Sequence, residues 1–188
     1  MGWQSHLPAT CLQLIALVWP LACWGIDIVG PLPAAPGGFR FAVVAIDYFS
    51  KWVEAEPLAK TTAKNVRKFF WRNLVCRFRV PLELTVDNGK QFEAAEFKEY
   101  CLCIGVKRCA ISVDHPQANG MVEKMNGTLF HGVARALTGL PKGKWVDVLP
   151  SVLWSIRTTA SRPTGFTPFK LLYGSEAVTP EEIRLGSL

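Results

Sequence analysis

The sequence contains no CxxC pair, and this absence excludes the commonest zinc-binding frameworks. Six cysteines are scattered along the chain and only three histidines accompany them, so these residues do not form a zinc finger. We expect reduced thiols that lie mainly in the core of an intracellular protein. The cysteines are Cys11, Cys23, Cys76, Cys101, Cys103 and Cys109.

The sequence also lacks a long uninterrupted hydrophobic run. Its most apolar stretch, residues 11–26, is shorter than the roughly 20 residues that a membrane-spanning helix needs, and Gln13 and Pro20 interrupt it. The first six residues contain no Lys or Arg, which a secretory signal requires near its start. We therefore expect no membrane partner.

Charged residues are few, at 19% of 188 residues, whereas hydrophobic residues make up 49%. This balance excludes a disordered chain, and the length suits one domain with a core of its own. There is no internal repeat. The formal net charge of +6 fits a polyanionic partner such as nucleic acid, although an ordinary basic surface explains it equally well.

The first third of the chain predicts three strands joined by short turns. Residues 24–29 form an apolar run that contains one acid, Asp27. Residues 39–48 are apolar on both alternating faces, as is typical of a central strand. Residues 52–58 alternate in polarity and carry Pro57, which suits an edge strand. Together these segments predict an antiparallel meander.

The segment 62–78 changes to helical periodicity, with one apolar face. Between Lys60 and Arg79 there are seven basic residues and no acidic one. This local charge is a candidate nucleic-acid contact, and a solvated helix face is an equally good explanation. The candidate DNA-binding residues on this helix are Lys64, Lys68 and Arg72.

The second half of the chain alternates between strands and helices. Besides the helix that follows residue 120, two short strands and three helices are predicted there, and a mixed sheet covered by helices follows from this order. The predicted strands are residues 81–86 and 106–113, and the predicted helices are residues 94–105, 145–158 and 167–173.

Residues 114–126, DHPQANGMVEKMN, predict a loop followed by a helix. Pro116 and Gly120 favour the loop. Apolar residues spaced by three and four from Val122 onward predict an amphipathic helix. Glu123 lies one position away from the apolar stripe, at the start of that helix.

Three acids stand out by their positions: Asp27 inside an apolar strand, Asp87 at the end of a strand, and Glu123 at the start of a helix. A carboxylate in an apolar strand is costly unless it is paired or bound to a metal. Converging carboxylates would suit Mg²⁺ or Mn²⁺, which prefer oxygen ligands. Any one acid taken alone is better explained as structural, a turn-forming role explains Asp87 as well as catalysis does, and Asp47 is as buried by pattern as Asp27.

Five segments together resemble the integrase catalytic core of plant Ty3/gypsy-type LTR retrotransposons. They are WGIDIVGP, VAIDYFSKWVEAEPL, VDNGKQF, HPQANGMVEKMN and VLWSIRTTASRPTGFTPFKLLYG. The resemblance covers residues 19–188. Residues 1–18 are expected to be a non-homologous extension, either disordered or the product of an incorrect gene model.

The resemblance implies an RNase H-like α/β fold, with a five-stranded mixed sheet flanked by helices. The catalytic and metal-binding D, D-35-E triad of the family falls on Asp27, Asp87 and Glu123, and 35 residues separate the last two. The implied activity is polynucleotidyl transfer with Mg²⁺ or Mn²⁺: 3′-end processing, then strand transfer of element DNA.

The resemblance also implies contacts with DNA and a multimeric state. The loop before the catalytic Glu approaches the DNA end in this family, and here it comprises His115, Pro116, Gln117, Asn119 and Gly120. Asn126, three residues after Glu123 on nearly the same helical face, orients the Glu123 carboxylate or touches DNA in this interpretation, and an ordinary surface Asn is an equal alternative. The implied partners are element ends, target DNA and further copies of the chain, and the implied place of action is the nucleus.

Three residues depart from the family pattern. Met121 stands where Gln is usual, Gly127 where Arg or Lys is common, and Phe130 where a basic residue can occur. We find no HHCC zinc-binding module and no SH3-like or chromodomain segment. These features predict a fragment of reduced activity. A non-catalytic nucleic-acid-binding module and an RNase H-type nuclease are the alternatives.

Overall fold

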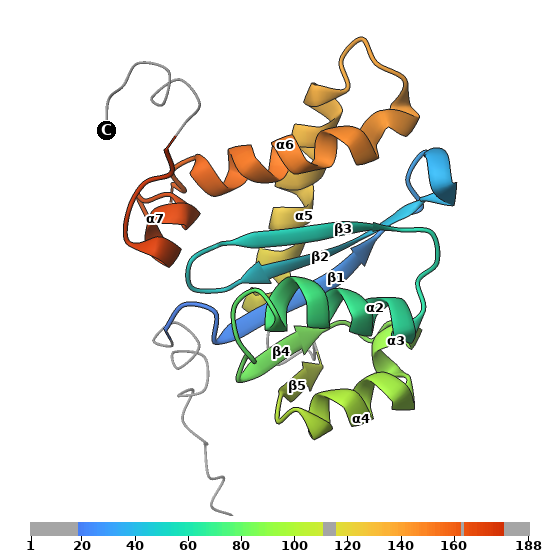
Figure 1. Cartoon of the computed structure of the whole chain (residues 1–188), viewed down its shortest axis with the longest axis vertical. Helices are drawn as coiled ribbons and strands as arrows, with labels where there is room; N and C mark the ends of the chain where they lie inside the picture. Colours follow the sequence, from blue (N-terminus) through green and yellow to red (C-terminus); the bar gives the residue numbers. More distant parts are fainter. Residues whose placement is uncertain (1–18, 111–115, 163, 179–188) are drawn as a thin grey trace, which may run out of the picture.

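The computed structural model describes residues 19–110, 116–162 and 164–178. Its centre is a five-stranded sheet of order β3-β2-β1-β4-β5 (Figure 1). Antiparallel pairing joins β1 to β2 and β2 to β3, whereas β1–β4 and β4–β5 are parallel. The predicted meander and mixed sheet are therefore confirmed. The strands are β1 (Cys23–Val29), β2 (Phe41–Asp47), β3 (Val53–Leu58), β4 (Glu83–Val86) and β5 (Lys107–Ala110).

Helices cover both faces of the sheet. One face carries α2 and α4, and the other carries α5, with α6 packed on α5 and β3 (Figure 1). The helices are α2 (Ala63–Phe69), the π-helical turn η3 (Phe70–Val75), α3 (Lys90–Glu93), α4 (Ala95–Cys103), α5 (Pro116–Ala136), α6 (Trp145–Thr158) and α7 (Pro168–Tyr173). Short 3-10 turns, η2 (Pro36–Gly38) and η4 (Lys142–Lys144), lie in the connections.

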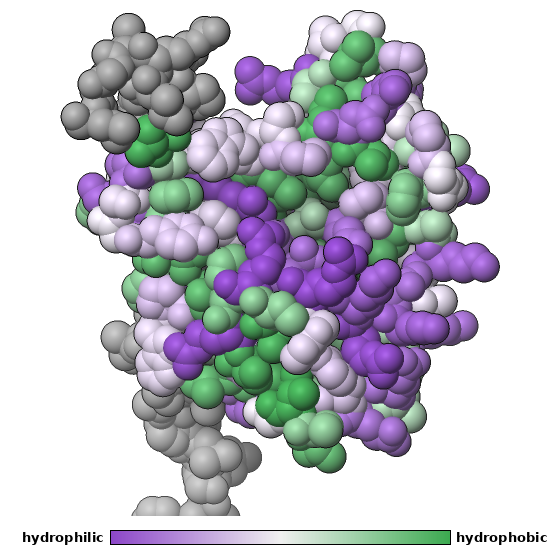
Figure 2. Space-filling view, viewed as in Figure 1, coloured by the Kyte–Doolittle hydropathy of each residue, from purple (hydrophilic) through white to green (hydrophobic). Residues whose placement is uncertain are grey.

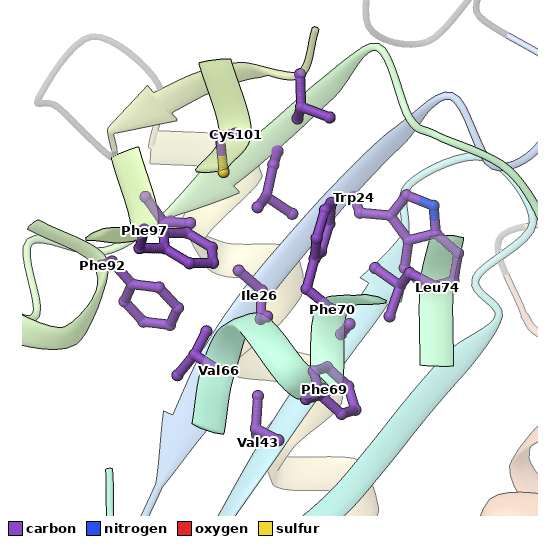
Figure 3. Packing of buried hydrophobic residues seen from close by; sticks show 14 of the residues in the cluster. Trp24, Ile26, Val43, Val66, Phe69, Phe70, Leu74, Phe92, Phe97 and Cys101 are labelled. Carbon is purple, nitrogen blue, oxygen red and sulfur yellow. The ribbon is translucent and has the colours of Figure 1, made fainter. Parts of the chain in front are cut away.

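The alternation of side chains along β1 divides the core into two layers. Trp24 and Ile26 face the layer that α2 and α4 cover, where aromatic rings from the helices pack on the sheet (Figure 3). Cys23 belongs to the opposite layer, which the apolar stripe of α5 covers with Val122, Leu129 and Val133. The alternation therefore determines which face of the sheet each β1 side chain lies on, including that of Asp27.

The basic helix begins where the sequence predicts. The side chain of Thr62 caps it by accepting a hydrogen bond from Asn65 N at 3.3 Å. The helix changes to π-type hydrogen bonding at Phe70, and Cys76 N donates to Trp71 O at 2.9 Å. Periodicity alone cannot reveal this turn, because it adds a residue without changing which large side chains are buried.

The predicted loop before Glu123 is wrong for residues 116–120. Helix α5 starts at Pro116, so Gly120 lies within it and does not have the positive φ of a loop glycine. Pro is compatible with the first turn of a helix, since the N–H it lacks would have no helical acceptor there. Asp114 and His115 lie outside the described residues.

The edge strand β3 is held against α6 by a buried ion pair. Glu54 Oε2 accepts from Arg157 Nη2 at 2.9 Å and from Arg77 Nη1 at 2.8 Å, while Glu54 Oε1 accepts from Trp52 Nε1 at 2.8 Å. The guanidinium of Arg157 also lies 4.6 Å from the Trp52 ring centroid. This network fixes α6 relative to the sheet.

The thiols only partly follow the expected core distribution. Cys23 and Cys101 are buried and Cys109 is half-buried, but Cys76 and Cys103 are exposed. All five are free thiols. Among the described residues, no helix is long and apolar enough to cross a membrane.

Candidate active site

Asp27 and Asp87 are brought together by the parallel pairing of β1 and β4. The register pairs Gly25 with Thr85 and Ile26 with Val86, so the next residues along both strands are the two aspartates. Neighbouring residues of parallel strands in register face the same side of the sheet. Both carboxylates therefore lie on the face that α5 covers.

The carboxylate of Asp27 is partly buried and held by two hydrogen bonds. Asp27 Oδ1 accepts from Ile28 N at 2.7 Å, and Oδ2 accepts from Asn126 Nδ2 at 2.7 Å. Burial raises the pKa of Asp27, the two hydrogen bonds oppose the rise, and the negative charges of Asp87 and Glu123 add to it. The three predicted catalytic acids therefore act on each other electrostatically.

Glu123 is positioned by the close packing of α5 on β1. A Cβ placed on Gly25 would lie 2.4 Å from Val122 Cγ2 and 2.5 Å from Tyr48 Oη, so only glycine allows this approach. Val122 is buried and the neighbouring Glu123 is exposed. The sequence contained this glycine, two residues before Asp27, but its role depends on a contact nearly 100 residues away in the chain.

Asn126 links α5 directly to the first aspartate. Its amide donor orients the Asp27 carboxylate, whereas the sequence analysis considered the carboxylate of Glu123 on the same helix. Its other amide atom, Oδ1, is buried and has no hydrogen-bond partner in the described part of the chain. A buried acceptor without a donor costs roughly 1–3 kcal/mol. A donor that arrives with a ligand would remove that cost.

The donor set suits a hard divalent cation, but the three acids do not form a closed cage. Across the described ranges, no group of three or more His, Cys, Asp or Glu side chains is arranged to hold a metal ion. Asp27 and Asp87 alone fit Mg²⁺, which commonly binds one or two carboxylates and keeps several waters. Ligation by Glu123 remains a prediction.

The predicted DNA-binding residues fall into two separate groups. Pro116, Gln117, Asn119 and Gly120 belong to the first turns of α5, on the same face of the sheet as the carboxylates. Lys64, Lys68 and Arg72 project from α2 and η3, which cover the other face. The structure therefore does not bring the basic helix to the carboxylates.

Asp47, which the sequence pattern made as buried as Asp27, has a structural role. Its carboxylate is fully buried and accepts from Leu21 N at 3.0 Å, from Ser50 N at 2.8 Å and from Ser50 Oγ at 2.6 Å. These bonds hold the β2–β3 turn, in which Lys51 has a φ of 64°. Asp47 is therefore no part of the carboxylate group.

The three residues that depart from the family pattern have different surroundings. Phe130 packs on the apolar layer beneath α5, and this packing explains why an aromatic ring stands at that position. Met121 Sδ lies 3.2 Å from Lys51 Nζ, a contact that the sequence did not indicate. Gly127 is exposed, and an added Cβ would meet nothing within 4 Å, so packing does not explain the glycine.

A mixed sheet of order β3-β2-β1-β4-β5 with helices on both faces defines the RNase H-like fold of integrase catalytic cores. The trimeric form of the HTLV-2 integrase catalytic core in complex with magnesium matches with a TM-score of 0.67 and 22% identity, over 82% of this chain and 97% of that one. The BIV integrase catalytic core matches with a TM-score of 0.65 and 22% identity, over 89% and 99%.

The sequence comparisons identify the family. The integrase core domain model matches residues 19–116, and the chain belongs to that family. The Gag-Pol polyprotein of avian reticuloendotheliosis virus is 36% identical over 80% of the chain, and the Pol polyprotein of radiation murine leukemia virus is 33% identical over 81%. The chain spans only 13% and 26% of these two polyproteins.

Proposed function

We propose that this chain is the catalytic core of a DDE polynucleotidyl transferase that processes and joins the DNA ends of a Ty3/gypsy-like LTR retrotransposon. The observation that carries the proposal is the adjacency of Asp27 on β1 and Asp87 directly after the parallel strand β4, with Glu123 and Asn126 on helix α5, which packs on β1. Proteins with this fold perform varied chemistry, so the site and not the fold supports the activity.

Asp27 and Asp87 would hold Mg²⁺ or Mn²⁺, with Glu123 as the third ligand. When bound, such ions activate an attacking oxygen and stabilise a leaving one in phosphoryl transfer. Asn126 keeps the Asp27 carboxylate in one orientation, and a bound cation would offset the burial and the neighbouring negative charges that raise the pKa of Asp27. The attacking group is water in 3′-end processing and a DNA 3′-hydroxyl in strand transfer.

The start of α5 would contact the DNA end. Its residues lie on the carboxylate face, and His115, which precedes them in the chain, completes the proposed contact. The unpartnered Asn126 Oδ1 is a ready acceptor for a donor on the substrate or on water. Target DNA and further copies of the chain are the other proposed partners, and the proposed place of action is the nucleus. One solved relative of 22% identity is described in an intasome, which supports the proposed assembly.

A strand-transfer assay tests the proposal directly. The substrate is an oligonucleotide that mimics a terminal repeat, in Mg²⁺ and in Mn²⁺, with wild type compared with Glu123→Gln. We expect joined products from wild type and loss of at least about 100-fold in the variant, the order of effect of removing a main charge-stabilising group. Equal yields from the two proteins would overturn the proposal.

A non-catalytic nucleic-acid-binding module is the second candidate. The observation that favours it is that, in the described residues, the three acids do not form a complete metal cage. This candidate predicts no joined or cleaved product with either metal, together with DNA affinity that Glu123→Gln leaves unchanged. Cleavage of an RNA–DNA hybrid without joined products would instead favour an RNase H-type nuclease.

A further inference from the structure

The position of Glu123 depends on how the residues just before it in α5 are held. Gly120 is exposed, and a Cβ added to it would meet nothing within 4 Å. Met121 and Val122, by contrast, pack on the apolar layer beneath the helix. Val122 is held by its close fit against Gly25. Met121 is held by a different contact, which comes from another part of the sheet.

Met121 is contacted by a lysine in the turn between β2 and β3. Lys51 Nζ donates to Met121 Sδ at 3.2 Å and also to Tyr48 O, within its own turn. Figure 1 shows the start of α5 behind the strands, near the end of the sheet where β2 turns into β3. Figure 2, seen from the same side, shows hydrophilic side chains gathered across the middle of the front face. The contact between Lys51 and Met121 is made behind that face, on the α5 side of the sheet.

The turn that carries Lys51 is itself firmly held. The buried carboxylate of Asp47 accepts from the backbone and the hydroxyl of Ser50, and Lys51 N donates to Asp47 O at 3.0 Å. Lys51 has a φ of 64°, which is uncommon for a residue other than glycine. Such a conformation persists only where the surrounding structure holds it. The turn therefore gives the Lys51 side chain a fixed base from which it contacts α5.

Fold stability alone does not explain a lysine at this position. Lys51 is half-buried and forms no ion pair within the described part of the chain. Burial lowers the pKa of Lys51, and the negative charge of Asp47 opposes this shift. One acceptor of its ammonium is a thioether, which is a weak acceptor. An apolar side chain would avoid the cost of partly desolvating a cation.

We propose that Lys51 is a positioning residue for Glu123: its ammonium ties the β2–β3 turn to Met121 and so sets the orientation of the α5 turn that presents the carboxylate. Met121 and Glu123 are separated by about 200° around the helix axis. Lys51 therefore holds one side of α5 while Glu123 is presented on the other. The inference rests on the proposed metal-dependent function, and Lys51 itself touches neither metal nor DNA in it.

Amide hydrogen exchange, measured by NMR on the metal-free protein, tests the contact without catalysis. The variant is Lys51→Met, which keeps an unbranched side chain and removes the N–H donors. We expect exchange to be about 3- to 10-fold faster for residues 121–125 and unchanged for residues 129–133, because one lost hydrogen bond frees only the turn that it holds. Equal acceleration along the whole helix would mean a merely structural role and would overturn the proposal, as would unchanged exchange at residues 121–125.

Lys142→Met is the matched control for the exchange experiment. Lys142 is an exposed lysine of η4, away from the start of α5, and its substitution removes the same charge. We expect unchanged exchange in both segments of α5. Faster exchange at residues 121–125 in this control would make the effect one of net charge, and the proposed contact would then fail.

Mg²⁺ titration by calorimetry tests whether the contact reaches the carboxylates. We expect Lys51→Met to weaken Mg²⁺ binding by about 3- to 10-fold. Met121→Gln offers the ammonium an oxygen acceptor and should strengthen binding by about 2-fold or more. In the Lys51→Met background, Met121→Gln should have no effect, because the donor is missing. Equal gains from Met121→Gln in both backgrounds, or unchanged Mg²⁺ affinity in Lys51→Met, would overturn the proposal.

The strand-transfer assay separates this inference from the proposed function. If wild type binds no Mg²⁺ and joins no DNA ends, the proposed function fails, whereas the exchange pattern still decides whether Lys51 holds the start of α5. If wild type joins DNA ends and Lys51→Met equals it in Mg²⁺ affinity and joined products, the proposed function stands and the positioning role fails. Circular dichroism checks that each variant is folded.

Discussion

Asp27 belongs to the candidate site, and its ionised carboxylate lowers the stability of the metal-free protein. Burial and two neighbouring negative charges raise its pKa, so its ionised form is disfavoured in the metal-free protein. A carboxyl whose pKa is higher in the folded state stabilises the fold below its unfolded pKa, and that contribution is lost as pH rises through the folded pKa. At neutral pH the ionised Asp27 is therefore a destabilising residue.

Asp27→Asn should stabilise the metal-free protein at pH 7. The neutral amide removes repulsion from Asp87 and Glu123 and keeps an oxygen that can accept from Asn126 or Ile28. Allowing for partial solvent screening, we expect the free energy of unfolding to rise by about 1 kcal/mol, which corresponds to an increase of about 2–4 °C in Tm. Calorimetry in EDTA measures this shift, and it should disappear near pH 3. A lower Tm in the variant at pH 7 would contradict the account.

Residue patterns indicated the acids of the site but not what holds them. Asp27 and Asp87 could be found because each interrupts or ends an apolar strand, and the family pattern added Glu123. The hydrogen bond from Asn126 to Asp27 was not predicted, since it joins residues 99 positions apart. The Lys51–Met121 contact gave no signal at all, because nothing local in either residue requires it.

The position of helix α5 depends on the absence of a side chain at Gly25. Gly25→Ala should destabilise the protein by about 1–3 kcal/mol, since the new Cβ would overlap Val122 and the Tyr48 hydroxyl. It should also weaken metal binding, because Glu123 and Asn126 move with the helix. Urea denaturation measures the first effect, and Mg²⁺ titration by calorimetry measures the second.

Val122→Ala provides the control for Gly25→Ala. If the clash is the cause, combining the two substitutions should recover part of the lost stability, so the double variant is more stable than the sum of the single effects predicts. Additive effects would mean that Gly25 is needed for a reason other than the approach of Val122.

The ion pair between β3 and α6 should contribute far more to the stability of the fold than surface ion pairs do. The Glu54 and Arg157 side chains are only 3% and 14% exposed. Glu54→Ala leaves the Arg157 charge buried without its partner, and we expect a loss of about 3–5 kcal/mol in urea denaturation. Arg77→Ala is the comparison: its side chain is 45% exposed, and its loss should cost about 1 kcal/mol or less. Similar losses would refute the distinction.

Elements with strong periodicity were predictable and their ends were less so. Helix α6 spans the predicted residues 145–158 because its apolar face is regular. The start of α5 was misjudged since Pro116 and Gly120 are loop formers locally, and in this fold both residues lie within a 21-residue helix. The π turn η3 needed the tertiary structure, because its extra residue is accommodated by packing against the sheet.

At the scale of the whole molecule, a bound cation should stabilise the fold in a pH-dependent way. At a Mg²⁺ concentration ten times the Kd, we expect about 1.4 kcal/mol of added stability at pH 7.5. The gain should shrink as pH falls through the raised pKa of Asp27, since protonation competes with the metal. Thermal denaturation with and without Mg²⁺ at several pH values measures it. Asp87→Asn should remove the effect, and a pH-independent gain would point to a different site.

The two-faced arrangement was beyond prediction from the sequence. The basic helix and the carboxylates were both found by pattern, but which side of the sheet each occupies depends on the alternation along β1 and on the path of the chain between strands. The family pattern implied the mixed sheet, but only the pairing of its strands shows that the basic helix and the carboxylates lie on opposite faces.

The contact between Arg157 and β3 also determines how copies of the chain can meet. Arg157 Nε and Nη2 donate to Val53 O at 3.0 and 2.7 Å, which occupies a carbonyl on the outer edge of the sheet. Pro57, further along the same strand, has no N–H to offer. An incoming strand would find the hydrogen-bond ladder interrupted at both places. Assembly by continuing the sheet from one molecule to the next is therefore disfavoured at β3, and self-association there must rely on helix surfaces.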